Sequence, residues 1–266
     1  MATEHERPQA AIVTEGAFPS YPPGLWRRIV LQPGDGWIAG ALEDDMHRFH
    51  LRIDHAGGII SAARAEAVRH PWTACPGAAP HIAAELVGAA LEDVARRDAT
   101  LHCTHLYDLA VLVAAHAGDT EPTWFDIHVA DRAGTRTTAT LAKDGVERLR
   151  WQLDGTMIVG PGEFAGRDIK RVSQWKHEYG QDIVEQAPLL RRVVFISGGR
   201  AFDPPPDLPY ASQQGPARIG VCFNFQLPRA EASVRRNPWH HDFSAGGPEP
   251  LAGFDPVSAF AAMAPA

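Results

Sequence analysis

The sequence predicts an α+β fold, because two kinds of hydrophobic periodicity alternate along its 266 residues. In several segments apolar residues recur at every second position, which is the spacing of a half-buried strand. In others they recur at every third or fourth position, which is the spacing of a helix with one buried face. With 45% hydrophobic and 21% charged residues, the chain can form one large domain or two small ones.

The first element expected is a β-hairpin. Residues 1 to about 24 contain four prolines and few large apolar residues, so we expect a mobile arm there. Alternation begins near Trp26 and is clearest at Phe49, Leu51 and Ile53. The sequence His55-Ala56-Gly57-Gly58 then predicts a turn, and residues 59–68 predict the returning strand.

Two helices are expected after the hairpin. Ile82, Leu86 and Ala89 have helical spacing, and Gly88 occupies the position of a C-terminal cap. Apolar residues within 106–117 predict the second helix.

Strands return after these helices and are followed by a third helix. Turn sequences at Ala133-Gly134 and Asp144-Gly145 separate the expected strands. The strands are predicted at 124–130, 135–141 and 148–159, and the helix at about 182–194.

The C-terminal part differs in composition from the rest. Three consecutive prolines within 203–207 predict a stiff linker, because each proline fixes φ and removes a hydrogen-bond donor. One buried strand is expected at 219–225, and disorder is expected after Pro248. We therefore divide the chain into the arm, an α+β core domain at 25–200, and an extension at 201–266. The extension is expected either to cover a pocket or to mediate association, for example into a homo-oligomer.

Composition narrows the range of partners. The 25 basic and 32 acidic residues give a net charge of −7, opposite to that of a typical nucleic-acid-binding protein. No apolar run approaches the roughly 20 residues of a membrane helix. The charged N-terminus does not resemble a secretory signal, and three cysteines fit a reducing compartment. We expect a cytoplasmic protein that binds a small molecule and no nucleotide cofactor.

Two cysteines are expected at the starts of helices. Cys75 precedes a proline, which suits a first helical turn. Cys103 precedes Thr104, the expected N-cap of the second helix, and lies between His102 and His105. Unpaired N–H groups and the dipole at a helix start favour the thiolate form. The simpler alternative is that both cysteines are small buried hydrophobic residues.

A carboxylate and another imidazole are predicted near these cysteines. Asp45 and His47 are two residues apart, so on a strand they would share the inward face with Phe49. His50 would then point outward. His47 is interpreted as a ligand, a base or a core histidine with satisfied hydrogen bonds.

Four further side chains are candidates for substrate contacts. Arg69 and Trp72 flank Cys75 and could line a pocket for a planar anionic ligand, with structural packing as the alternative. The pair Arg191-Arg192 could hold a substrate carboxylate through bidentate contacts, with surface salt bridges as the alternative.

This composition predicts a metal site. Cysteine and histidine suit Zn or Fe, and a carboxylate can complete the set, so the expected ligands are Asp45, Cys75, Cys103 and His105. The expected function is an enzyme that hydrolyses, cleaves or isomerises a small organic-acid or aromatic metabolite. Asp45, His47, Cys75 and His105 would be its catalytic residues. Without a metal, His105 could activate Cys75 as a nucleophile. A ligand-binding module with merely buried cysteines is a further alternative.

The motifs resemble an uncharacterised bacterial family known only as a domain of unknown function. They are Asp45-Met46, Cys-Pro-Gly-Ala-Ala-Pro at 75–80, Leu86-Val87-Gly88, and Cys103-Thr104-His105-Leu106. The resemblance covers about residues 25–200. The family usually has a histidine before the Asp-Met pair, and this chain has Asp44 there.

A more distant resemblance is to iron–sulfur cluster assembly scaffolds of the NifU type, over about residues 40–118. It rests on Asp45, Cys75, Leu86-Val87-Gly88 and the pair His102-Cys103. It implies a small antiparallel sheet backed by helices, and a metal or cluster carrier as the alternative function. At the position of the first cysteine of these scaffolds, this chain has Glu43. The missing thiolate favours a mononuclear metal or a thiol-based reaction over cluster building.

Overall fold

The computed structural model describes residues 23–200, 210–236, 241–244 and 248–264. The N-terminal arm up to residue 22 and the triple-proline linker lie outside the described residues.

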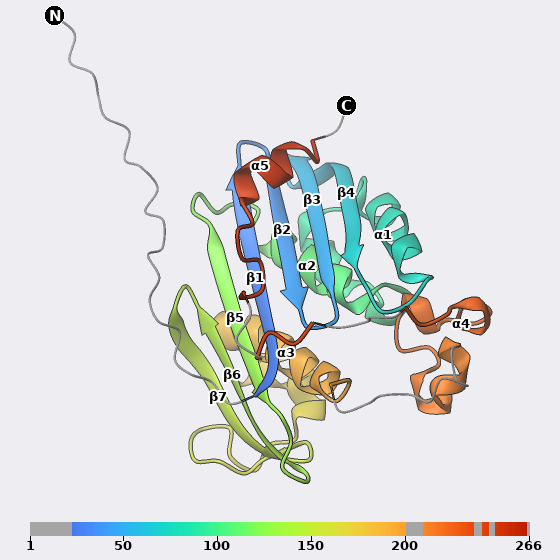
Figure 1. The fold of residues 1–266 in the computed structure, drawn as a ribbon. Helices are drawn as coiled ribbons and strands as arrows, with labels where there is room; N and C mark the ends of the chain where they lie inside the picture. Colours follow the sequence, from blue (N-terminus) through green and yellow to red (C-terminus); the bar gives the residue numbers. More distant parts are fainter. Residues whose placement is uncertain (1–22, 201–209, 237–240, 245–247, 265–266) are drawn as a thin grey trace, which may run out of the picture.

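A single antiparallel sheet of eight strands forms the centre of the fold, in the order β4-β3-β2-β1-β5-β6-β7-β8 (Figure 1). The two predicted groups of strands join where β1 pairs with β5, with Ile29 opposite Phe125. The α+β class is therefore confirmed, and the sheet is larger than the scaffold resemblance implied. The strands are β1 (Gly24–Gly34), β2 (Trp37–Asp44), β3 (Arg48–Ala56), β4 (Ile59–Arg69), β5 (Thr123–Ala130), β6 (Arg136–Lys143), β7 (Val146–Asp154) and β8 (Met157–Ile158).

Two of the predicted turns connect neighbouring strands as expected. Gly57 and Gly58 join β3 to β4 with φ of 58° and 80°, and Asp144 and Gly145 join β6 to β7 with φ of 52° and 76°. A two-residue hairpin with a type I′ turn requires positive φ at both central positions, which Gly-Gly and Asp-Gly sequences provide.

Three helices cover one face of the sheet (Figure 1). Helix α1 packs on β4, α2 packs on β2 and β3, and α3 packs mainly on β1, β5 and β6. A Cβ atom at Gly40 of β2 would lie 3.1–3.2 Å from Leu109 and Val113, so α2 packs closely on the sheet there. Within the described ranges no helix has both the length and the apolar character needed to cross a bilayer. The helices are α1 (Ala78–Leu86), α2 (Thr104–Ala115), α3 (Gln181–Ser197), α4 (Arg229–Ala232) and α5 (Pro256–Ala261).

Part of the opposite face of the sheet, over β1, β2 and β3, is covered by the C-terminal segment, where the sequence predicted disorder. Helix α5 lies across this face (Figure 1), and Phe260 is fully buried. His50, expected to point outward, is only 7% exposed because Phe254 and Phe260 lie against it. The cause is an apolar patch on the outer face, formed by Val30, Ala39 and Ala41, which packs with Leu251, Phe260 and Met263.

Residues 210–236 form short turns and α4 instead of the predicted strand at 219–225. Gly220 has φ of 81°, which interrupts an extended conformation, and Phe223–Phe225 is a 3₁₀ turn. The Thr73 N–H donates to the Val234 carbonyl oxygen at 2.9 Å, and the Phe223 N–H donates to that of His102 at 2.9 Å. This part of the extension therefore lies against the loops that carry Cys75 and Cys103.

A buried ion pair at the C-terminal end of α2 is expected to make stability depend on pH. His116 Nδ1 lies 2.6 Å from Asp119 Oδ2, and its Nε2 lies 2.9 Å from Glu185 Oε2. Burial alone would lower the pKa of His116, but these two carboxylates outweigh burial and raise it. A raised folded-state pKa stabilises the fold fully below the unfolded-state pKa of about 6.5, and this stabilisation is lost as pH rises through the folded-state pKa.

We therefore expect His116→Gln to reduce the free energy of unfolding more at pH 6 than at pH 9. Urea unfolding of both proteins at the two pH values measures the difference, which is about 1.4 kcal/mol for each unit of pKa elevation. The exposed His177 provides a control, because His177→Gln should have a small effect at both values. An equal loss for His116→Gln at pH 6 and pH 9 would contradict the assignment.

Candidate functional site

The site begins at the turn between β2 and β3. The Asp44 N–H donates to the His47 carbonyl oxygen at 2.8 Å. Asp44 Oδ1 accepts from the N–H groups of Met46 and His47, each at 2.8 Å. An aspartate side chain that accepts backbone donors two and three residues ahead stabilises a tight turn. The sequence Asp-x-x-His thus places the Asp44 and His47 side chains next to each other.

The Asp44 carboxylate is fully buried and paired with an arginine of β1. Arg27, 1% exposed, donates from Nε to Asp44 Oδ2 at 3.0 Å and also from Nη2. Burial alone would raise the pKa of Asp44, but the charges of Arg27 and His47 outweigh it and hold the pKa well below its usual range. Asp44 is therefore ionised at neutral pH, and His47 Nδ1 donates to its Oδ1 at 3.0 Å.

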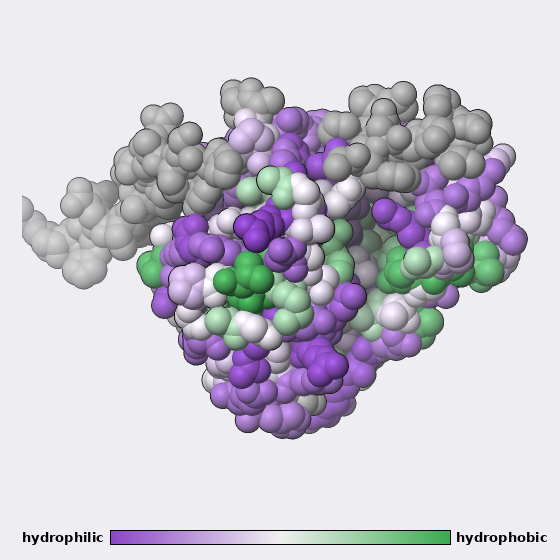
Figure 2. Space-filling view, turned by 90° about the horizontal axis from the view of Figure 1, so that it is seen from below, coloured by the Kyte–Doolittle hydropathy of each residue, from purple (hydrophilic) through white to green (hydrophobic). Residues whose placement is uncertain are grey.

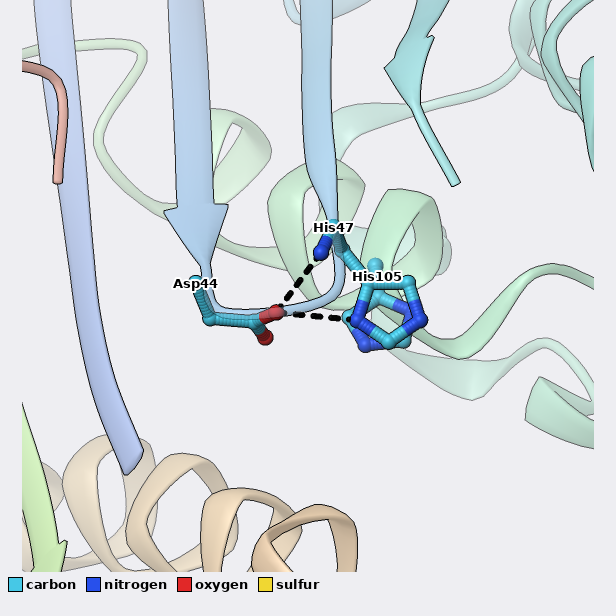
Figure 3. A group of neighbouring side chains, drawn as sticks. All are labelled: Asp44, His47 and His105. Atoms are coloured by element: carbon cyan, nitrogen blue, oxygen red, sulfur yellow. Dashed lines mark hydrogen bonds and ion pairs between the residues drawn. The ribbon is translucent and has the colours of Figure 1, made fainter. Parts of the chain in front are cut away.

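The second imidazole comes from the first turn of α2. The His105 ring stacks on the His47 ring with centroids 3.7 Å apart and an interplanar angle of 29° (Figure 3). Among the described residues, His105 Nε2 is buried and has no hydrogen-bond partner, and Nδ1 lies 3.7 Å from Cys103 Sγ. Burial lowers the pKa of His105 well below its usual value, and the charges of His47 and Arg27 lower it further. The His105 ring is therefore neutral at pH 7.

These three side chains form a group that could hold a metal ion. Asp44, His47 and His105 each offer one ligand atom, and these atoms lie within 4.8 Å of one another. No other three His, Cys, Asp or Glu side chains in the described part of the chain meet this condition. Metals bind deprotonated ligands, and the ionised Asp44 and neutral His105 are in that form at pH 7.

Asp45, predicted as a ligand or base, lies outside this group. It belongs to the turn between β2 and β3, so the two-residue periodicity of a strand does not place it beside His47. Its carboxylate instead pairs with Arg200 and accepts the Trp26 N–H at 3.4 Å. Burial raises the pKa of Asp45 to about 7, and Arg200 opposes this effect.

The two predicted cysteines lie at helix starts but not in the metal-binding group. Cys75 begins a 3₁₀ turn before α1, and Cys103, rather than Thr104, is the N-cap of α2. Both are buried, with 8% and 7% exposure. Burial raises the pKa of Cys103 to about 12 and that of Cys75 well above its usual value. Desolvation therefore outweighs the helix starts, and both are thiols rather than the expected thiolates.

The predicted substrate contacts have different environments. Arg69 donates to the Asp45 carbonyl oxygen at 2.6 Å and to Glu43 Oε1 at 3.1 Å, so it holds the turn between β2 and β3 in place. Trp72 lines the cavity described below. Its ring lies edge-on to that of Phe225, with the ring centroids 5.7 Å apart.

A cavity of about 270 Å³ brings several of the predicted residues together. His47, Cys75, Cys103 and His105 all line it. Figure 2 shows a hollow between the part of the molecule that carries α4 and the main body, with apolar surface beside it. Much of the remaining wall comes from α3 and from residues 214–235 of the extension. This part of the extension therefore covers one side of the cavity, which was one of its two expected roles.

No family model matches the chain, and no curated protein matches it either. The two resemblances suggested by the motifs therefore remain expectations, and the functional argument rests on the geometry.

Asp44 and Arg27 are the site residues that the sequence did not single out. Asp44 was a usable signal, because aspartate side chains commonly accept backbone N–H groups a few residues ahead in a turn. Arg27 offered no local signal, since it meets Asp44 only through the register in which β1 and β2 pair.

Proposed function

We propose that the protein is an enzyme that holds one Zn or Fe ion between Asp44, His47 and His105. Its substrate would be a small organic-acid or aromatic metabolite. The observation that carries this proposal is that the two imidazoles of the group lie on the wall of a cavity. A carboxylate and two imidazoles, with open positions for substrate or water, are a common donor set for catalytic zinc and iron.

Metal binding would require a local rearrangement of His47. A metal bound by an imidazole nitrogen lies in the plane of the ring, so two stacked rings cannot share one ion without turning. The oxygens of Asp44 already accept five hydrogen bonds, three at Oδ1 and two at Oδ2. A turn of the His47 ring would break its bond to Oδ1 and free an acceptor site on Asp44 for the metal.

The chemistry of such a site follows from its position. A metal at the cavity wall can polarise a substrate carbonyl group or lower the pKa of a bound water. Both effects serve hydrolysis, C–C cleavage or isomerisation of a carbonyl compound.

A second candidate is acid–base catalysis by His47 without a metal. In the neutral form of His47, the 3.0 Å hydrogen bond to Asp44 keeps the proton on Nδ1 and leaves Nε2 as a base. The described residues offer that Nε2 no hydrogen-bond partner. The same cavity would then bind the substrate, but the protein would need no metal.

The alternative function, a carrier of a metal or an iron–sulfur cluster, has less support. Glu43 stands where the scaffold resemblance places a cysteine, and its carboxylate is already occupied. Glu43 Oε1 accepts from Arg69 at 3.1 Å, and Oε2 accepts the Leu251 N–H at 2.7 Å.

Metal content of purified variants tests the proposal. After chelation and reloading with Zn²⁺ or Fe²⁺ under reducing conditions, we expect about one ion per chain, as in a mononuclear catalytic site. His105→Phe should lose the ion, because phenylalanine preserves the stacked ring but has no ligand nitrogen. Cys75→Ser/Cys103→Ser should keep it. Loss of the ion in the cysteine variant, or its retention in His105→Phe, would contradict the proposed ligands.

A further inference from the structure

The cavity is lined mainly by apolar side chains, and many of them are aromatic. Five aromatic residues line it: Phe49 of β3, Trp72 after β4, Phe195 of α3, and Phe223 and Phe225 of the extension. Aromatic side chains pack well against the edge or face of another ring. A planar aromatic ligand would therefore meet rings from both the core and the extension.

The cavity is large enough for one substituted ring. Its volume is about 270 Å³. A cavity of roughly 150 Å³ lined by apolar side chains stays dry and binds benzene. The additional volume here would accept a short substituent on the ring.

The charged groups of the wall are engaged by the protein itself. Three arginines line the cavity, and Arg192 donates to Asp108 through two hydrogen bonds of 3.1 and 3.3 Å. Arg218 and Arg235 also have interactions of their own. None of the lining residues in the described part of the chain is an aspartate or glutamate. An ionic ligand would have to compete with these interactions, whereas an uncharged ligand would not.

Asn224 brings a hydrogen-bond donor without a partner to this wall. It is 2% exposed, and its Oδ1 accepts from the Ser233 hydroxyl group at 2.6 Å. That hydroxyl in turn accepts the Ala74 N–H at 3.3 Å, which is consistent with the assigned amide orientation. Nδ2 is buried and has no hydrogen-bond partner among the described residues. A buried donor without a partner is unfavourable, and an acceptor on a bound ligand would relieve this.

We infer that the cavity binds uncharged aromatic compounds that carry a carbonyl group, with the ring among the aromatic side chains and the carbonyl oxygen accepting from Asn224 Nδ2. This inference deepens the proposed function and rests on it for the reaction at His47 and His105. An amide N–H and a carbonyl oxygen are a matched neutral donor and acceptor. The extension would then anchor the substrate, and the core would supply the reactive side chains.

Calorimetric titration with three small probes tests the ligand class. Acetophenone has the ring and the carbonyl group, ethylbenzene has the ring alone, and benzoate has the ring and a charge. We expect acetophenone to bind about tenfold or more tightly than benzoate, because burying a charge without a free partner is unfavourable. Ethylbenzene should also bind, because an apolar cavity is sufficient to hold a ring.

Variants of Asn224 test the hydrogen bond to the carbonyl group. Asn224→Leu should weaken acetophenone binding by about fivefold or more and leave ethylbenzene binding nearly unchanged. Comparing the two losses cancels the difference in hydration between the two probes. Asn224→Asp is a second variant that keeps an acceptor for the Ser233 hydroxyl group but has no N–H donor, so it should show the same selective loss.

The matched control is Gln226→Leu, which makes the same kind of substitution two residues away. The Gln226 amide lies outside the cavity wall in the described structure and donates to the Thr100 carbonyl oxygen at 2.8 Å. This variant should bind acetophenone and ethylbenzene as the parent does. Circular dichroism confirms that each variant is folded.

The titrations are run on both metal-free and Zn²⁺-loaded protein, so that the two proposals can fail separately. Acetophenone binding that depends on Asn224, in a protein that binds no metal, would support this inference and contradict the metal site. A Zn²⁺-loaded protein that binds neither acetophenone nor ethylbenzene would do the reverse. Benzoate binding as tight as that of acetophenone, or unchanged acetophenone affinity in both Asn224 variants, would also overturn the inference.

Discussion

Arg27→Met is expected to destabilise the fold by about 3–5 kcal/mol, because it leaves a buried charge without its partner. Asp44 is fully buried. Among the described residues its carboxylate forms ion pairs only with Arg27 and His47. Methionine is similar in length to the arginine stem, so the lost interaction is mainly electrostatic. Denaturant unfolding at pH 7 measures the change in the free energy of unfolding.

The control for this prediction is Arg136→Met on the same sheet. The Arg136 side chain is 77% exposed and pairs with Asp154, so its replacement should cost less than about 1 kcal/mol. Adding Asp44→Asn to Arg27→Met should recover part of the lost stability by removing the unpaired charge. A loss below about 1 kcal/mol for Arg27→Met would mean that the pair does not organise the site as described.

Zinc binding is expected to raise the melting temperature of the metal-free protein by about 5–10 °C. At a free concentration 100 times the Kd, a ligand that binds only the folded state adds about 2.7 kcal/mol. For a chain of this size, each kcal/mol corresponds to roughly 2–4 °C. Scanning calorimetry with and without Zn²⁺ measures the shift.

His105→Phe separates this effect from nonspecific binding. The variant keeps a ring between His47 and Phe49 and removes a buried nitrogen that has no partner in the described structure, so it should fold at least as stably as the metal-free parent. We expect almost no zinc-dependent shift in it. A shift equal to that of the parent would place the zinc elsewhere.

Local patterns predicted the three main helices and most of the strands of the core, but not the separation of β1 from β2 or of β7 from β8. Asp144-Gly145 and Gly57-Gly58 have turn chemistry that few other conformations satisfy, so their positions could be derived from the sequence. The strand predicted at 219–225 was wrong, because apolar spacing there reflects burial of Phe223 and Phe225 in turns. A short apolar segment has the same sequence pattern whether it forms a strand or buried turns.

The candidate site depended on long-range pairing that no local pattern contains. His47 and His105 were predicted, and the structure stacks them although 58 residues separate them in the chain. The choice of Asp45 over Asp44 was wrong for the metal-binding group, because the chain turns at Asp45 instead of continuing as a strand. The helix-start argument for Cys75 was also insufficient, since the burial of its thiol could not be derived from the sequence.

X-ray absorption at the zinc edge tests the metal site most directly, because it identifies the atoms bound to the ion. Zinc loaded at one equivalent should show nitrogen and oxygen neighbours at about 2.0–2.2 Å, with the multiple-scattering signature of two imidazoles. These would be His47, His105 and the Asp44 carboxylate. A sulfur neighbour at about 2.3 Å would contradict this assignment and place the metal on Cys75 or Cys103.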